Sequence, residues 1–374
     1  MMSELRQMVD IGRLLRHGGP SICNIAVTNV CNATCDFCNF AYDKGLVTHR
    51  SYIDVDNYRD ALDILYRRGV RYLTFQGGEP LLHPAMADMV AMSTAKGMVP
   101  AIVTNGWLLP KRLDELAEAG LKTVFISIDS AVAAEHERNR GLKGVCDRIR
   151  EATARMVELE MTPMASVTMN KLIRDYRALV PFLRELGFAA VSFSYPRKAA
   201  LGSSSLVYSE DSDLVDFTPE QLITAFQDVN DLRTDFPVQN PQASLADMQR
   251  HVRGDVETFP CFGGYKHFYM DWKLDLYRCE AWDERMCSIW DFEQTPLIRD
   301  GCTACTTDCY RDSSVMLHFA VSIGDALNNL GRGRVGKAAA DLFTRANLKS
   351  VGAVWSHRRI LARQAALGRR TSDY

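Results

Sequence analysis

Apolar and polar residues recur along the first half of the chain with two different periods. Short runs rich in β-branched and aromatic residues predict β-strands near residues 22–27, 72–76, 100–104, 123–128, 164–169 and 190–195. Between them, apolar residues at helical spacing predict helices near residues 53–68, 84–96, 111–119, 146–159 and 171–186. Alternating strands and helices indicate parallel βαβ units. Six units predict an α/β fold, a partial (β/α)6 barrel with its working residues at the carboxyl ends of the strands.

Three cysteines follow the first predicted strand at short spacing. Cys31, Cys35 and Cys38 are separated by three and then by two residues. Thiolates in such a loop can hold an iron–sulfur cluster, and three of them would leave one iron of a four-iron cluster without a protein ligand. Structural zinc normally takes four ligands, and no histidine lies closer than His17 and His49. A redox thiol group is the other alternative, but the spacing favours an iron–sulfur site.

The aromatic Phe37 precedes the third cysteine, and the whole spacing resembles the signature of the radical S-adenosylmethionine (radical SAM) superfamily. Gly77, Gly78, Glu79 and Pro80 follow the second predicted strand and resemble the glycine-rich loop of that family, which contacts the amino group of SAM. Glycines let a backbone approach a ligand closely. A plain turn is the alternative interpretation of this segment.

Polar residues also end the next three predicted strands. Asn105 follows the third, Ser127 and Asp129 end the fourth, and Asn170 follows the fifth. The resemblance implies that residues at these places contact the ribose and carboxylate of SAM. Alternatively, Asn105 and Gly106 form a tight turn, and Asp129 caps the next helix.

The second half of the chain holds a second group of cysteines. They are Cys261, Cys279, Cys287, Cys302, Cys305 and Cys309. Between the first two, the alternating and aromatic residues 267–278 predict a β-hairpin. This arrangement resembles the Twitch domain of radical SAM enzymes, a shortened SPASM domain that binds one auxiliary [4Fe–4S] cluster.

The Twitch resemblance implies Cys261, Cys279, Cys302 and Cys305 as the ligands of the auxiliary cluster, with Cys287 and Cys309 as alternates. The chain departs from the family at Leu274, where glycine is common. A zinc knot built from the same cysteines is the alternative.

Composition predicts four parts of the chain. A segment rich in glycine, serine and acidic residues near 198–217 predicts a boundary. We therefore expect an N-terminal helix over residues 1–20, the radical SAM partial barrel over 21–217, the Twitch-like domain over 218–312 and a basic amphipathic helical tail over 313–374.

Charge is distributed unevenly along the chain. Residues 311–374 contain 11 Lys and Arg against 4 Asp and Glu, a net charge of +7, whereas the whole chain carries −2. Basic helices with an apolar side can lie on anionic membranes, and a solvated helix packed on the barrel is the alternative. No apolar run approaches the roughly 18 residues of a membrane span. We expect a cytoplasmic protein with peripheral contact to the inner face of the membrane as an alternative, and no nucleic-acid partner, because few aromatic residues interleave with the basic ones.

The family resemblance implies the chemistry. A [4Fe–4S] cluster held by three cysteines would reductively cleave SAM to a 5′-deoxyadenosyl radical, which abstracts hydrogen from a C–H bond. The reducing partner would be a flavodoxin or ferredoxin, and the auxiliary cluster would assist a two-electron oxidation or anchor the substrate. We expect a small or lipid-linked hydroxylated substrate. The alternatives are a peptide-modifying SPASM-type maturase, disfavoured because only about 20 residues precede the first predicted strand, and a non-catalytic zinc-binding or electron-carrier protein.

Overall fold

The computed structural model describes residues 12–45, 47, 49–196, 212–282 and 284–369. These residues form a nine-stranded sheet in the order β6-β5-β4-β3-β2-β1-β7-β8-β9. The parallel part consists of β1 (Ser21–Thr28), β2 (Val70–Gly77), β3 (Val99–Thr104), β4 (Thr123–Ile128), β5 (Thr162–Thr168) and β6 (Ala190–Ser194). The predicted partial (β/α)6 barrel is therefore confirmed.

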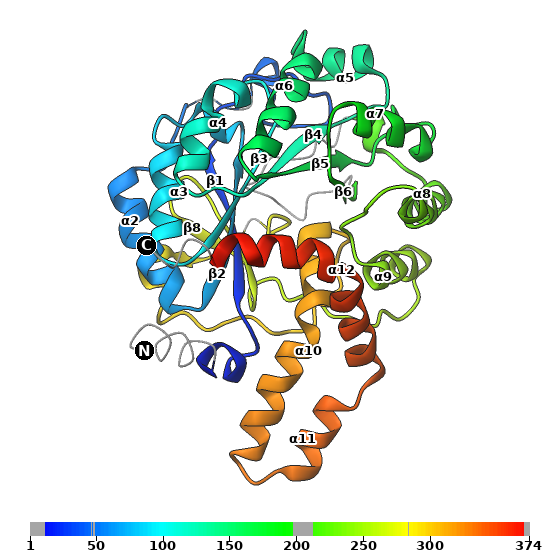
Figure 1. Ribbon diagram of the computed structural model, residues 1–374. Helices are drawn as coiled ribbons and strands as arrows, with labels where there is room; N and C mark the ends of the chain where they lie inside the picture. The colour runs from blue at the N-terminus through cyan, green and yellow to red at the C-terminus, as the bar shows by residue number, and fades with distance from the viewer. Residues whose placement is uncertain (1–11, 46, 48, 197–211, 283, 370–374) are drawn as a thin grey trace.

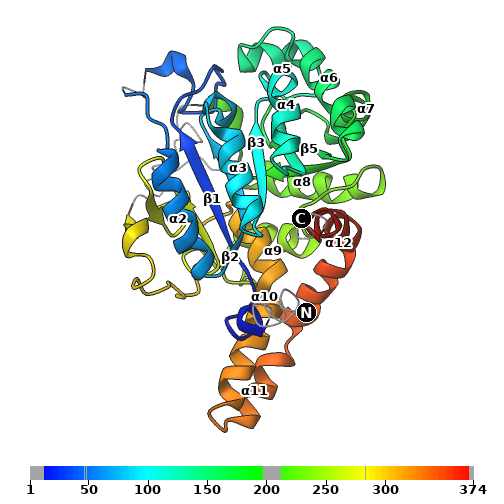
Figure 2. The ribbon, with the colours of Figure 1, turned by 60° about the vertical axis from the view of Figure 1, so that its left-hand side comes forward.

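Helices cover the outside of the curved sheet (Figures 1 and 2). They are α2 (Val55–Arg67), α3 (Met86–Ala95), α4 (Leu109–Glu118), α5 (Ala133–Arg140), α6 (Val145–Glu158) and α7 (Leu179–Glu185). Helix α2 shows the local logic, since Asp54 caps it by accepting from the Asn57 backbone N–H at 2.9 Å. Its buried residues Tyr58, Leu62 and Leu65 recur at helical spacing and face the core.

One predicted helix is shorter than expected, and one helix was missed. The helix predicted over residues 171–186 begins at Leu179, because the Asn170 side chain accepts from the Leu172 backbone N–H (2.9 Å) and holds the preceding residues in a turn. Helix α5 was not predicted, since its sequence is mostly polar and buries only His136 and Arg140. Local apolar periodicity could not identify it.

Short 3₁₀ helices join several elements. They are η1 (Tyr42–Lys44), η2 (Pro80–Leu82), η3 (Tyr176–Ala178), η4 (Asp213–Val215), η5 (Leu232–Thr234) and η6 (Ile289–Asp291). The predicted linker falls largely on residues 197–211, which lie outside the described residues, as do residues 1–11 of the predicted N-terminal helix. Residues 12–16 are helical.

The second half of the chain adds strands to the barrel sheet. After α8 (Pro219–Asp231) and α9 (Gln242–Arg253), strand β7 (His267–Met270) runs parallel to β1 and antiparallel to β8 (Asp275–Tyr277), which pairs with β9 (Arg285–Ser288). Strands β7 and β8 are the predicted hairpin. In its turn, Leu274 has a φ of +64°, which favours glycine, and it keeps its side chain buried in the core.

Three helices complete the molecule: α10 (Asp308–Leu330), α11 (Val335–Leu342) and α12 (Arg345–Arg369). The start of α10 packs on the sheet, where Ser313 Oγ lies 2.9 Å from His267 Nδ1 on β7. Helix α12 folds back along α10, and Ser350 Oγ donates to the Val315 carbonyl at 2.7 Å. The boundary predicted between residues 312 and 313 lies within α10. Searched for membrane spans, the described helices include none of sufficient length and apolar character.

Candidate cluster and cofactor sites

The first three cysteines lie in the loop after β1. Cys35 is buried, and Cys31 and Cys38 are partly exposed. The Cys38 backbone N–H donates to the Cys35 carbonyl at 3.1 Å, which closes a tight turn. Burial, followed by the charges of Glu79 and Cys38, raises the pKa of Cys31 to about 12. The pKa of Cys35 in turn is influenced by both Cys31 and Cys38, so the three thiols lie close together.

The donor set fits an iron–sulfur cluster better than a single ion. Within the described part of the chain, no group of three or more His, Cys, Asp or Glu side chains is arranged to hold one metal ion. Each thiolate of a four-iron cluster binds a different iron atom, so the three thiols need to surround a cluster and need not meet at one point.

The cysteine loop rests on the end of α5. The Thr34 backbone N–H donates to the Arg140 carbonyl at 2.9 Å, and the Asp36 N–H donates to Asn139 Oδ1 at 3.4 Å. Gly141 follows with a φ of +63°, and a Cβ at this position would lie 2.2 Å from Thr34 Oγ1. Only glycine therefore lets the two segments approach this closely.

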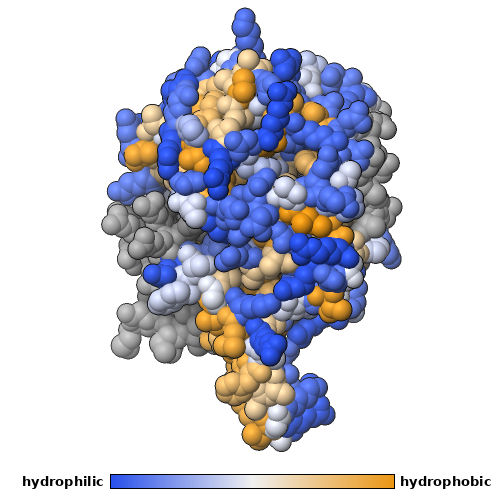
Figure 3. Space-filling view, turned by 90° about the vertical axis from the view of Figure 1, so that its right-hand side faces the viewer, coloured by the Kyte–Doolittle hydropathy of each residue, from blue (hydrophilic) through white to orange (hydrophobic). Residues whose placement is uncertain are grey.

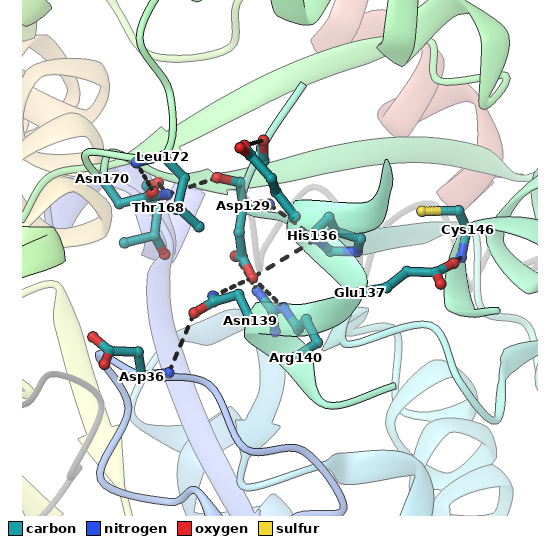
Figure 4. A network of polar contacts seen from close by, with 12 residues as sticks. Asp36, Asp129, His136, Glu137, Asn139, Arg140, Cys146, Thr168, Asn170 and Leu172 are labelled. Atoms are coloured by element: carbon teal, nitrogen blue, oxygen red, sulfur yellow. Dashed lines mark hydrogen bonds and ion pairs between the residues drawn. The ribbon is translucent and has the colours of Figure 1, made fainter. Parts of the chain in front are cut away.

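Arg140 places a buried cation beside the three thiols. Burial raises the pKa of each cysteine in the loop, and the charge of Arg140 acts in the opposite direction on all three. The guanidinium donates to Asp129 through Nε at 2.7 Å and through Nη2 at 2.6 Å (Figure 4). This is the paired geometry in which arginine binds carboxylates most strongly.

Asp129 is the centre of a network at the end of β4. Its Oδ2 also accepts from Asn139 Nδ2 at 2.8 Å, and its backbone N–H donates to His136 Nδ1 at 3.2 Å (Figure 4). Burial alone would raise the pKa of Asp129, but Arg140 and His136 outweigh burial and hold the pKa below its usual value. The carboxylate is thus ionised and bound by protein donors on both oxygens.

The glycine-rich loop packs directly on the cysteine loop. The Gly78 N–H donates to the Thr28 carbonyl at 2.9 Å, and the Glu79 N–H donates to the Val30 carbonyl at 2.7 Å. A Cβ on Gly78 would lie 2.1 Å from the Val30 oxygen. Gly77 has a φ of +130° and would place its Cβ 2.3 Å from the Thr28 oxygen. These contacts explain why this loop requires two adjacent glycines.

Glu79 and Pro80 complete that loop and are buried. The carboxylate of Glu79 accepts from the Leu81 N–H (3.0 Å), Thr104 Oγ1 (2.7 Å) and the Asn105 N–H (2.8 Å). Burial raises the pKa of Glu79, and these hydrogen bonds lower it. Glu79 therefore ties the loop after β2 to the end of β3.

The other predicted cofactor residues also lie at the carboxyl ends of the strands. Asn105 Nδ2 donates to Asn32 Oδ1 in the cysteine loop at 2.8 Å. Asn170 is buried and donates to the Asp129 carbonyl at 2.9 Å. Ser127 is half-buried on β4, and Phe37 is buried between two of the cysteines. The fold thus gathers residues from the ends of β1 to β5 around the cysteine loop.

Four cysteines of the second group also lie together. The Cys261 N–H donates to the Cys302 carbonyl at 2.8 Å. Burial, followed by the charges of Cys305 and Cys302, raises the pKa of Cys261 to about 12. The pKa of Cys279 is raised to about 12 by burial first and then by Cys305 and Cys261. Backbone N–H groups of Gly263 and Ala281 donate to Cys261 and Cys279 sulfurs, both at 3.4 Å, and such bonds favour thiolates.

The two alternates differ in their surroundings. Cys287 lies on β9, where burial raises its pKa and its neighbours are Thr295, Asp291 and Arg68. Cys309 lies close to Cys279 and accepts from Asn24 Nδ2 at 3.6 Å. Of the two, Cys309 is therefore the one placed beside the second group.

Two site residues were not singled out from the sequence, Arg140 and Glu280. Glu280 directly follows Cys279 and is buried, and its Oε1 accepts from Asn24 Nδ2 on β1 (2.9 Å) and Gln76 Nε2 on β2 (2.5 Å). These two strands precede the cysteine loop and the glycine-rich loop. Adjacency to a predicted ligand was the available signal for Glu280, whereas nothing local in the sequence pairs Arg140 with Asp129.

Comparison with known proteins covers mainly the first half of the chain. Residues 25–175 match the family described as the Radical SAM superfamily. GTP 3′,8-cyclase of Chlorobaculum tepidum is 34% identical over 151 residues, which cover 40% of this chain and 44% of that protein. PqqA peptide cyclase of Gluconobacter oxydans is 28% identical over 175 residues, 45% of this chain and 47% of that protein. The chain thus spans less than half the length of these curated relatives.

Solved structures resemble the chain over a larger part. Streptococcus suis SuiB bound to S-adenosylmethionine has a TM-score of 0.55 at 15% identity, over 76% of this chain and 68% of that one. The protein anSMEcpe with bound AdoMet has a TM-score of 0.52 at 15% identity, over 86% and 98%. At these identities the likeness concerns the fold. The family match over the barrel and the fold agree, and the chain belongs to the radical SAM superfamily.

Proposed function

We propose that this chain is a radical SAM enzyme with one auxiliary [4Fe–4S] cluster in a Twitch-like domain. We further propose that it abstracts hydrogen from a C–H bond of a small or lipid-linked hydroxylated substrate. A reduced [4Fe–4S] cluster, when bound, supplies the electron that cleaves SAM. The residues of the chain hold the reactants in position and exclude water, which is the usual protein contribution to cofactor chemistry.

One observation carries the proposal of two linked sites. The carboxylate of Glu280, next to Cys279, is bound by Asn24 of β1 and Gln76 of β2. The cysteine loop leaves β1, and the glycine-rich loop leaves β2. A side chain beside the second cysteine group is therefore fixed to both strands that carry the first site. This arrangement supports a shared active site, with the auxiliary cluster facing the same substrate.

Each proposed ligand has a stated role. Cys31, Cys35 and Cys38 would hold the first cluster, and Arg140 provides positive charge beside it. Glu79 holds the glycine-rich loop in position through three protein donors. The second cluster would be held by Cys261, Cys279, Cys302 and Cys305. A flavodoxin or ferredoxin would supply electrons to the first cluster.

Anaerobic reconstitution tests the two-cluster proposal. The wild-type chain should bind about eight iron atoms, by the cluster count above. Changing Cys31, Cys35 and Cys38 together to alanine should remove about half of the iron and abolish methionine formation from SAM. Changing Cys279 and Cys302 to alanine should remove the other half.

Cys287→Ala is the matched control, because Cys287 lies apart from the second group, and it should retain all iron. Stoichiometric zinc without iron in the anaerobic protein would contradict the proposal. So would methionine formation that persists in the first triple variant.

A peptide substrate is the second candidate. It is supported by the similarity of residues in the first half to PqqA peptide cyclase, a protein whose name states a peptide substrate. Substrate-dependent SAM cleavage distinguishes the two: it should be stimulated by hydroxylated small molecules or lipid-linked sugars under our proposal, and by peptides under the alternative.

A further inference from the structure

The three C-terminal helices form a hairpin whose far end projects from the barrel (Figures 1 and 2). This end comprises the last turn of α10, all of α11 and the start of α12. We call residues 327–349 the helical tip. Because most of it stands clear of the barrel, the side chains on its outer side are available to a partner.

The inner side of the helical tip is held by buried polar side chains. Asn329 Nδ2 donates to Asp341 Oδ2 at 2.7 Å, and Asn347 Nδ2 donates to the carbonyls of Asp341 and Leu342, both at 2.8 Å. Ser322 Oγ donates to Asn347 Oδ1 at 2.9 Å. Asn347 is only 2% exposed. The turn between α11 and α12 is therefore a fixed part of the fold and presents a defined outer surface.

The outer side exposes large apolar side chains. Phe343 is 87% exposed and Leu348 is 76% exposed. Leu327, Leu330 and Val335 are also exposed. Figure 3 shows apolar residues gathered on one side of the projecting end, with hydrophilic residues beside them. Concentrated apolar exposure of this kind marks an interaction site, because each such side chain gains free energy when it leaves water.

Basic residues accompany this apolar surface. Arg332, Arg334, Lys337, Arg345 and Lys349 are all exposed. The helical tip has one acidic residue, Asp341, and Asn329 already binds it. Five basic residues and one acidic residue make a net charge of +4, whereas the whole chain carries −2. A second copy of the chain would bring the same positive charge to the contact, which disfavours self-association.

We propose that the helical tip docks onto an anionic lipid surface. Phe343 and Leu348 would enter the boundary between headgroups and acyl chains, and the five basic residues would contact anionic headgroups. The proposal does not rest on the catalytic function, since docking requires neither clusters nor substrate. It would hold the barrel next to a membrane, where a lipid-linked substrate is available.

Vesicle co-sedimentation tests the docking. The full-length protein should sediment with vesicles of phosphatidylcholine and phosphatidylglycerol, and only weakly with vesicles of phosphatidylcholine alone. Added salt should weaken the binding, because it screens exposed charges. Phe343→Ser should weaken it about tenfold, since burial of one aromatic side chain is lost. Combined Arg334→Gln and Lys337→Gln should weaken it by about tenfold or more.

Val157→Ser is the matched control, because Val157 is 65% exposed on α6 and lies outside the helical tip. It should bind as wild type. The thermal unfolding temperature of each variant should also match wild type, which would show that the fold is intact.

Equal sedimentation with neutral and anionic vesicles would overturn the proposal, as would unchanged binding by Phe343→Ser. A dimer seen in sedimentation velocity and lost in Phe343→Ser would assign the helical tip to self-association, and would overturn it too.

Discussion

At the scale of single residues, charge around the cysteine loop is set by a buried pair. Asp129 holds the guanidinium of Arg140 through two hydrogen bonds, and Arg140 in turn lies beside three thiols. Thiolates bound to iron carry negative charge, and a fixed cation near them stabilises the more negative, reduced state of a cluster. Asp129 was expected to contact the cofactor, and in the structure both of its oxygens bind protein donors. The pair therefore has a positioning role toward the first cluster.

Replacing Arg140 tests that role. Arg140→Met removes the cation and should lower the midpoint potential of the first cluster by about 60 mV, a tenfold change in the one-electron equilibrium. Because the single change leaves Asp129 buried and unpaired, Arg140→Met with Asp129→Asn is the better folded comparison. Potentials are measured by a redox titration followed by electron paramagnetic resonance. Arg140→Lys should restore most of the potential, and equal potentials in all variants would contradict an electrostatic role.

His136 makes the same network sensitive to acid. Burial lowers the pKa of His136 to about 4, although the nearby Asp129 acts to raise it. In the unfolded chain the pKa is 6.5, so on acidification the unfolded state takes up the proton first. Stability from this group is complete above pH 6.5 and is lost as the pH falls toward 4, by about 3 kcal/mol in all.

The measurement compares unfolding temperatures of wild type and His136→Asn at matched pH values. Asparagine can present its Oδ1 in place of Nδ1 to the Asp129 N–H. The variant should lose less stability than wild type between pH 6.5 and 4. Parallel pH profiles for the two proteins would show that His136 does not contribute.

At the scale of elements, the sequence predicts what depends on local periodicity. All six parallel strands were predicted because β-branched runs recur between amphipathic helices. Strand β7 was predicted as part of a hairpin, but its pairing with β1 joins Ile22 to His267, and no local pattern encodes a contact over that separation. Helix α5 was missed because its buried residues His136 and Arg140 are polar and serve the site. The cysteine and glycine spacings identified the candidate site, whereas its supporting network depends on tertiary contacts.

Leu274 shows how an element can depart from a family pattern. The position commonly holds glycine in related domains, and here the residue has a φ of +64°. A leucine in this conformation costs roughly 1–2 kcal/mol. Its side chain is 5% exposed and packs in the main core, which offsets that cost because burying a leucine stabilises by about 1.5–3 kcal/mol. The departure is therefore compatible with the β7–β8 turn.

At the scale of the whole molecule, the C-terminal helices close against the segment that leads into the barrel. Helix α10 crosses residues Gly18 and Gly19 just before β1. A Cβ on Gly324 of α10 would lie 2.7 Å from the Gly18 nitrogen and 2.9 Å from its Cα. The Lys266 ammonium also donates to the Gly19 carbonyl at 2.9 Å. Backbone packs on backbone here, so the contact has no flexible side chain that could yield.

Gly324→Ala should therefore separate α10 from the start of β1 and destabilise the fold by about 1–3 kcal/mol, the usual cost of overpacking. Gly336→Ala is the matched control, because a Cβ on Gly336 in α11 would meet no heavy atom within 4 Å, and alanine there should be neutral or stabilising by up to about 1 kcal/mol. Thermal unfolding and iron content are measured together. Since α10 follows Cys302 and Cys305 directly, Gly324→Ala should lose iron from the second cluster at a lower temperature than wild type, while the first cluster persists longer. Loss of both clusters in one step would show that barrel and helices unfold as a unit, and an unchanged unfolding temperature would show that α10 can shift without cost.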